Sequence, residues 1–151
     1  MSRWRDSCSG RGSLSPHRPR TPPPTVLLFA GPGEESDELF AEVSRREDLC
    51  LLRVATAAAA GRAIAEMPVA LVVASPEVPV AAVDAVLAHL AAARPGTPVL
   101  ALRARQAPGP AAWSARGVAV LRMPLLAGVL SRSIDVVLGM RRRAGGGAAP
   151  V

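Results

Sequence analysis

The 151-residue sequence lacks most of the residues on which metal sites, disulfide frameworks and membrane spans depend. It has no lysine and no tyrosine, and only two cysteines, two histidines and four aromatic residues. Two cysteines are too few for a disulfide framework or a cysteine-based zinc cluster, and two histidines argue against a metal site. No apolar run reaches the roughly 18 residues of a membrane span, and none follows the early arginines as in a secretory signal. We therefore expect a cytoplasmic protein with no membrane contact, no metal and no cofactor.

The net charge of +6 is concentrated near the two ends of the chain. Residues 1–25 carry five arginines and one aspartate, and three consecutive arginines follow Met140. The segment between them, residues 26–140, holds ten arginines and eleven acidic residues, so its net charge is −1. Basic ends of this kind are usually solvated. We therefore expect no basic face on the folded body and no direct nucleic-acid binding.

Composition divides the chain into three parts. Residues 1–24 are rich in Ser, Gly, Pro and Arg, a composition that cannot bury enough apolar surface to fold. An Arg- and Ser-rich start is also typical of organellar transit peptides, although its prolines would break the amphipathic helix that such peptides need. Residues 142–151 are Gly-rich and typical of a flexible tail or a truncated linker. We expect a disordered leader over residues 1–24, one domain over residues 25–141 and a flexible tail over residues 142–151.

Five short apolar runs alternate with segments of helical spacing in the body. The runs predict strands over residues 25–30, 49–55, 69–74, 98–102 and 118–121. The segments between and after them predict helices over residues 34–48, 57–67, 80–94, 111–115 and 126–140. Ser36 is the expected N-cap of the first helix and Thr56 that of the second.

Strands joined by helical crossovers pair in parallel, and right-handed crossovers place helices on both faces of the sheet. The pattern therefore predicts the α/β class, with a doubly wound five-stranded parallel sheet in a flavodoxin-like (βα)5 sandwich. The alternative is an all-helical fold, because Ala-rich segments form helices well. The short Val/Leu runs, which end at Gly or Pro, favour strands.

Four segments of the body carry a family resemblance by their order and spacing. They read RAIAEMPVALVV over residues 62–73, SPEVP over 75–79, TPVLAL over 97–102 and WSARGVAVLRMP over 113–124. Together they resemble the approach to the third strand, the loop after the phosphoacceptor, the fourth strand, and the fifth strand with its Lys-Pro in the receiver domain of bacterial response regulators. The resemblance covers residues 25–141 and implies a receiver-like sandwich with a role in two-component signalling or a phosphorelay.

The positions at which that family performs aspartate phosphorylation are occupied here by other residues. The acidic pair that holds Mg²⁺ falls on Ala30 and Gly31, and the phosphoacceptor falls on Ser75, or on Ala74 by the other alignment. Arg103 replaces the hydroxyl residue that ends the fourth strand, and Met123 replaces the lysine. Without the acids, the lysine and a bound Mg²⁺, aspartyl-phosphate chemistry has no electrostatic support. No catalytic residue and no metal ligand is therefore expected.

Two smaller possibilities remain around this pocket. Glu34, Glu35 and Glu77 follow the first and third strands and could loosely hold a cation, although solvated rim charges and charges at a helix start are much more common. Arg103 and Arg122 could hold an anion at the strand ends, although arginines that shield a sheet edge are more common.

These expectations combine into a non-enzymatic pseudo-receiver, a receiver-like protein-interaction module that is not phosphorylated on aspartate. In the resembling family the last strand and helix dock partners, so we expect a protein partner or a homodimer at the corresponding segment. The apolar residues of the last helix form the candidate interaction face: Leu126, Val129, Leu130, Ile134 and Val137. Two alternatives stay open, a subunit or fragment of a transcriptional regulator or ParA-like ATPase, and a ligand-binding or enzymatic flavodoxin-like domain.

Overall fold

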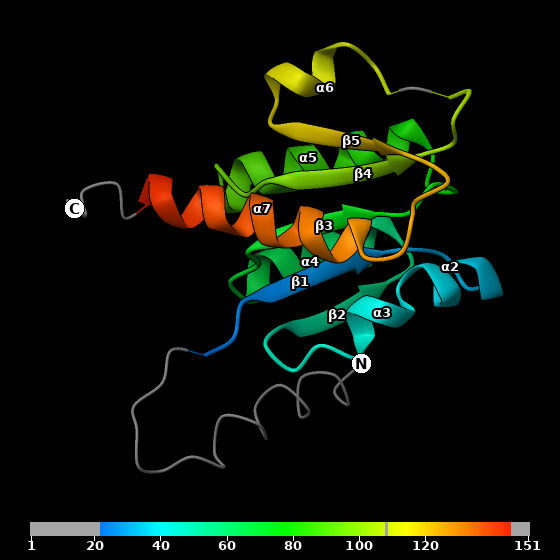
Figure 1. Ribbon diagram of the computed structural model, residues 1–151. Helices are drawn as coiled ribbons and strands as arrows, with labels where there is room; N and C mark the ends of the chain where they lie inside the picture. The colour runs from blue at the N-terminus through cyan, green and yellow to red at the C-terminus, as the bar shows by residue number, and fades with distance from the viewer. Residues whose placement is uncertain (1–21, 108, 146–151) are drawn as a thin grey trace, which may run out of the picture.

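The computed structural model describes residues 22–107 and 109–145, without the side chains of residues 140–145. Within them five parallel strands form one sheet in the order β2-β1-β3-β4-β5 (Figure 1). The strands are β1 (Thr25–Phe29), β2 (Cys50–Val54), β3 (Leu71–Ala74), β4 (Val99–Arg103) and β5 (Val118–Arg122). The predicted five-stranded parallel sheet is confirmed. Of the leader expected over residues 1–24 and the tail expected over residues 142–151, residues 1–21 and 146–151 lie outside the described residues.

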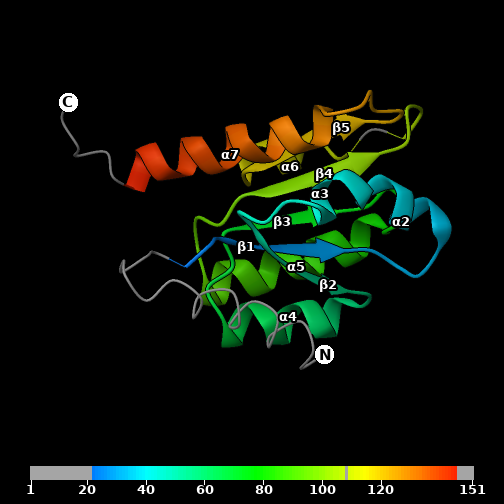
Figure 2. The same ribbon diagram turned by 60° about the horizontal axis from the view of Figure 1, so that its bottom comes forward.

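Helices cover both faces of this sheet, as the doubly wound fold requires (Figure 2). One face carries α4 (Ala57–Glu66), α5 (Val80–Ala93) and α6 (Ala112–Ala115). The other carries α3 (Ala41–Ser44) and α7 (Val129–Gly145), with α2 (Glu34–Leu39) immediately before α3. None of the helices in the described residues combines the length and the apolar character needed to cross a bilayer.

Two hydrophobic cores result from the alternation of side chains along each strand. In β1, Leu27 and Phe29 face α4 and α5, whereas Val26 and Leu28 face α3 and α7. Nearly every residue of β1, β3 and β4 is buried, which explains why these segments read as continuous apolar runs. The edge strand β5 differs, because three of its five residues are exposed.

The helix predicted over residues 34–48 is two helices in the structure. The backbone of Phe40 lies at φ −95° and ψ 4°, which interrupts the helix between α2 and α3. Phe40 and Val43 are both buried, so the apolar spacing continues across the break and conceals it. The predicted cap at Thr56 is confirmed, because its side chain accepts the N–H of Ala59 at 3.0 Å.

The last helix begins three residues later and ends five residues later than predicted. Gly128 has a φ of +84°, a left-handed conformation that an α-helix cannot pass through, so α7 begins at Val129. The backbone N–H of Gly128 donates to Glu42 Oε1 at 3.2 Å, and this bond joins the start of α7 to α3. The helix ends at Gly145 and so includes residues 142–145, which the sequence placed in the tail.

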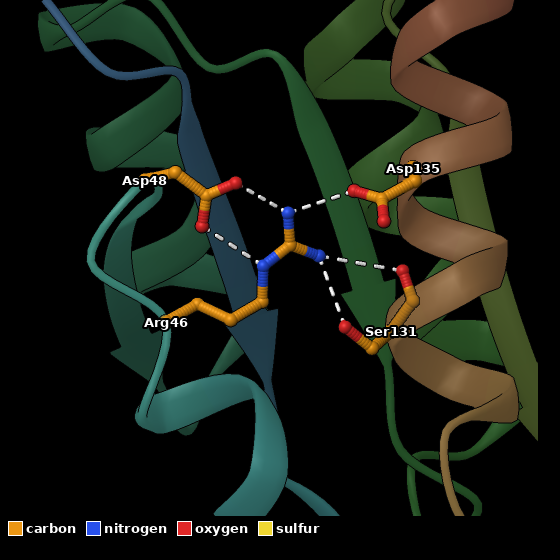
Figure 3. Close-up of polar contacts among 4 residues, drawn as sticks. All are labelled: Arg46, Asp48, Ser131 and Asp135. Atoms are coloured by element: carbon orange, nitrogen blue, oxygen red, sulfur yellow. Dashed lines mark hydrogen bonds and ion pairs between the residues drawn. The ribbon is translucent and has the colours of Figure 1, made fainter.

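A second polar contact fixes α7 against the segment between α3 and β2 (Figure 3). The side chain of Arg46 is only 18% exposed and makes a two-point ion pair with Asp48 through Nε and Nη2. Nη2 also bonds Asp135 of α7 at 2.7 Å, and Nη1 donates to Ser131 Oγ at 3.0 Å. Hydrogen bonding to Asp48 is the main reason that the pKa of Arg46 is raised above its ordinary value. One arginine therefore ties two segments that lie far apart in the sequence.

Candidate functional site

The carboxyl ends of the strands bring the positions assigned to the phosphorylation pocket to one edge of the sheet. Ala30 and Gly31 follow β1, and Ser75 follows β3 and donates its backbone N–H to the last residue of β1 at 2.9 Å. Arg103 ends β4, and Met123 follows β5 and donates its N–H to the Arg103 carbonyl at 2.8 Å. Ligands of α/β sheets usually bind at this edge. No carboxylate and no lysine occupies any of the five positions.

A carboxylate from a different position lies over these strand ends. Glu77, in the loop between β3 and α5, accepts the backbone N–H of Gly31 and the hydroxyl of Ser36 at its Oε2, each at 2.9 Å. The buried Ser75 hydroxyl is close by, but it makes no hydrogen bond of ordinary geometry among the described residues. Glu77 thus accepts hydrogen bonds from two segments, the β1–α2 loop at Gly31 and helix α2 at Ser36.

The hydrogen bonds keep Glu77 charged. Burial raises the pKa of its carboxyl group, but the nearby Ser75 hydroxyl, the Ser36 hydroxyl and backbone N–H groups lower it by more. The net pKa lies below the ordinary value of 4.5. Glu77 is therefore an anion at neutral pH, held by neutral donors rather than by a cation.

A shallow hollow of about 240 Å³ opens beside this carboxylate. Its lining consists of Glu35, Ser36, Leu39, Pro76, Glu77 and Met123. The loose cation site considered for Glu34, Glu35 and Glu77 is not formed, because no three His, Cys, Asp or Glu side chains among the described residues are placed to hold a metal ion.

The prediction that Ser36 is the N-cap of the first helix is wrong. The N-cap of α2 is Gly33, and Ser36 lies within the helix with only 3% of its surface exposed. Its hydroxyl bonds Glu77, which is 41 residues away. A residue that sequence reasoning treated as a local helix cap is therefore part of the strand-end site, and no local pattern marks this role.

Arg103 crosses the end of β4 and joins the two loops beside it. Nη1 donates to the carbonyl of Val78 in the β3–α5 loop at 3.1 Å, and Nε donates to the carbonyl of Ala107 in the β4–α6 loop at 3.2 Å. The guanidinium carbon lies 5.8 Å from the centroid of the buried Trp113 ring, which is the geometry of a cation–π contact. Trp113 in turn donates its Nε1–H to Asp84 Oδ1 of α5 at 2.8 Å.

Because of these contacts, Arg103 does not form an anion site together with Arg122 in this structure. Its Nε and Nη1 are bonded to carbonyl groups, whereas Arg122, its neighbour in register on β5, is exposed and makes no side-chain hydrogen bond or ion pair with the described residues. Arg122 is followed by Met123 and by a cis peptide bond between Met123 and Pro124.

The candidate interaction face of the last helix is largely internal. Leu130 and Ile134 are 1% and 0% exposed and belong to the core beneath α7, so they cannot contact a partner while the domain is folded. Val129 and Val137 are half-buried, and only Leu126 is well exposed, at 80%. Two side chains that the face did not include are exposed, Val120 of β5 and Val136 of α7. An apolar helix residue can face the sheet or solvent, and the sequence does not distinguish the two.

The comparisons with known proteins concern the fold. No protein-family model matches this sequence, and no curated protein matches it. Among solved structures, the signal receiver domain of a protein described as a LuxO repressor from Vibrio parahaemolyticus superposes with a TM-score of 0.68 at 19% identity. The match covers 85% of this chain and 99% of that one.

Two further structures share the architecture. The receiver domain of a sensor histidine kinase from Pseudomonas aeruginosa, solved with a magnesium ion in its active-site cleft, has a TM-score of 0.59 at 18% identity over 78% of this chain and 98% of that one. A lysine decarboxylase from Francisella novicida has a TM-score of 0.60 at 10% identity; the match covers 78% of this chain but only 17% of that one. The chain therefore has the receiver-like fold.

Proposed function

We propose that this receiver-fold chain is a protein-interaction module in signalling or regulation that works without phosphorylation of an aspartate. The observation that carries the proposal is the strand-end site, where Glu77 and Arg103 are already bonded to the chain itself. Phosphoryl transfer from a small donor needs a carboxylate nucleophile, a divalent cation and a positive group for the developing charge. The positions that would supply them hold Ala30, Gly31, Ser75 and Met123.

The charge at the site also disfavours the reaction. Glu77 places a permanent negative charge beside Ser75, and an incoming phosphoryl group is itself an anion. The basic group near Ser75 is the Glu77 carboxylate, and its Oε2 already accepts two hydrogen bonds, from the Gly31 N–H and the Ser36 hydroxyl. The site is thus better suited to holding the loops in one arrangement than to chemistry.

The interaction surface that we propose lies over the last strand and helix. Val120, Leu126 and Val136 are the large apolar side chains that are exposed among the described residues, and all three belong to β5, α7 or the loop between them. Large exposed apolar side chains favour contact with another protein. Leu126 is the one member of the original candidate face that remains well exposed.

Mass spectrometry of the intact chain tests the absence of phosphorylation. The protein is incubated with acetyl phosphate and Mg²⁺, beside a receiver domain that has the full acidic set as a positive control. We expect the control to gain one phosphoryl group and this chain to keep its mass. An acid-stable or acid-labile phosphoryl adduct on this chain would show that the proposal is wrong.

A further inference from the structure

A second hollow lies at the end of the sheet opposite to Glu77, beside the last turns of α5. It has a volume of about 270 Å³ and is bordered by the segments that lead into β4 and β5, at the amino ends of these strands (Figure 1). Helix α6 has four residues and α5 has fourteen, so α6 cannot cover the full length of α5. We call this space the α5 hollow.

The lining of the α5 hollow is mostly apolar and includes two polar side chains. The polar ones are Thr97, two residues before β4, and Arg116, two residues before β5. The apolar ones come from the second half of α5 and the turn after it: Leu87, Leu90, Ala91 and Pro95. An apolar hollow with a few polar groups placed in it is typical of sites for small molecules.

The hydroxyl group of Thr97 is buried without a hydrogen-bond partner. Only 9% of the residue is exposed, and Oγ1 makes no hydrogen bond with the described part of the chain. The backbone N–H of Thr97, by contrast, donates to the Arg94 carbonyl at 3.2 Å. A buried hydroxyl in this condition has lost its bonds to water and destabilises the fold. A ligand that bonds Oγ1 from the α5 hollow would recover this loss.

Arg116 brings a positive charge to the α5 hollow. Its side chain is 44% exposed, and its Nη1 lies 3.7 Å from Asp84 Oδ1, which is too long for a hydrogen bond. The same oxygen already accepts the Nε1–H of Trp113 at 2.8 Å. The guanidinium therefore makes no hydrogen bond with residues 22–107 and 109–139, and its N–H groups can donate to an anion that enters.

We propose that the α5 hollow binds a carboxylate that is joined to a short branched apolar group. This binding function goes beyond the proposed interaction with a protein and uses none of the residues at the strand-end site. The carboxylate accepts hydrogen bonds from Arg116 and from the Thr97 hydroxyl, and the apolar group packs against Leu87 and Leu90. One guanidinium matches one negative charge. A phosphate group carries up to two, and the partial negative charge at the end of α5 would repel it further.

Amide NMR of the isotope-labelled full chain tests the proposal, with isovalerate as the probe. We expect the signals of Ala91, Gly96 and Thr97 to shift as isovalerate is added, with a dissociation constant on the order of 1 mM. The signals of Gly31 and Glu77, at the other end of the sheet, should not move. Isovaleramide has nearly the same shape without the charge and should bind at least roughly tenfold more weakly.

The same chemistry occurs in free acids and at the carboxyl end of a polypeptide, and N-acetylvalinate represents the second source. Tighter binding of isovalerate identifies a free acid as the ligand, and tighter binding of N-acetylvalinate identifies a chain end. Either result supports the proposed site.

Two substitutions locate the ligand. Arg116→Gln removes the charge, and Thr97→Val removes the hydroxyl but keeps the shape; each should weaken the binding of isovalerate roughly tenfold. Thr97→Val should also raise the midpoint of urea unfolding, because it removes a buried polar group that has no partner. This second measurement shows that the variant is folded. Arg105→Gln is the control, because it removes the same charge from an exposed side chain outside the α5 hollow and should bind like the wild type.

Four results would overturn the inference. They are a Thr97 signal that does not shift in up to about 20 mM isovalerate, equal binding of isovaleramide, equal losses in Arg105→Gln and Arg116→Gln, and a lower urea midpoint in Thr97→Val. The last result would mean that the hydroxyl already has a partner in the free protein. None of them bears on phosphorylation, which the mass measurement with acetyl phosphate tests separately.

Discussion

Replacing Arg46 by methionine removes the guanidinium that ties α7 to the segment between α3 and β2, and it keeps most of the aliphatic volume. The carboxylates of Asp48 and Asp135 are 64% and 56% exposed, so each ion pair contributes on the surface scale, between about 0.2 and 1 kcal/mol. The hydrogen bond to Ser131 adds about 1 kcal/mol. We therefore expect Arg46→Met to lower the free energy of unfolding by about 2 kcal/mol.

Urea unfolding followed by circular dichroism measures this loss. Arg45→Met is the matched control, because Arg45 is exposed and its side chain makes no hydrogen bond or ion pair with the described residues; its effect should stay within about 0.5 kcal/mol. Hydrogen bonding to Arg46 holds the pKa of Asp48 below its ordinary value of 3.8. The contribution of the Arg46–Asp48 ion pair to the free energy of unfolding is therefore fully present above about pH 4. It is lost as the pH falls through the lowered pKa of Asp48. Equal stability of the two variants at neutral pH would refute the reasoning.

Two further substitutions probe the strand-end site and the packing of α4 on α5 in the same assay. Glu77→Ala leaves the buried Ser36 hydroxyl without its acceptor and should cost about 1 kcal/mol at neutral pH, whereas Glu35→Ala in the same hollow should cost less than about 0.5 kcal/mol. Because the pKa of Glu77 is lowered, its contribution should be complete above pH 4.5 and disappear as pH falls below that value. A Cβ at Gly61 would lie 2.6 Å from His89 Nε2, at the far end of an exposed side chain that has to rotate away, so in the wild type Gly61→Ala should gain less than the roughly 1 kcal/mol expected from helix propensity. In a His89→Ala background the same change should stabilise by up to about 1 kcal/mol, and destabilisation there would contradict the close-approach argument.

The sequence predicts the sheet well because buried parallel strands have a local signature. Each of the five predicted apolar runs coincides with a strand to within two residues at either end, and Gly or Pro residues mark several of these ends. The cap at Thr56 is also local, because the donor lies three residues away. Interactions within a few residues can be inferred from spacing alone.

The strand-end site depends on contacts that no local pattern encodes. Glu77 bonds groups 41 and 46 residues away, and its role depends on how the β3–α5 loop meets α2. The direction of side chains on α7 is similarly a packing outcome, since Leu130 and Ile134 face the sheet while Val136 faces solvent.

The position of Ser75 has a consequence for how this fold could acquire new chemistry. An aspartate introduced at residue 75 would be buried next to the carboxylate of Glu77, and two acids at one site cannot easily both lose their protons. One of them would stay protonated, which weakens it as a nucleophile or as a metal ligand. Acquiring a phosphoacceptor therefore requires at least two coordinated substitutions, the first of which brings no benefit.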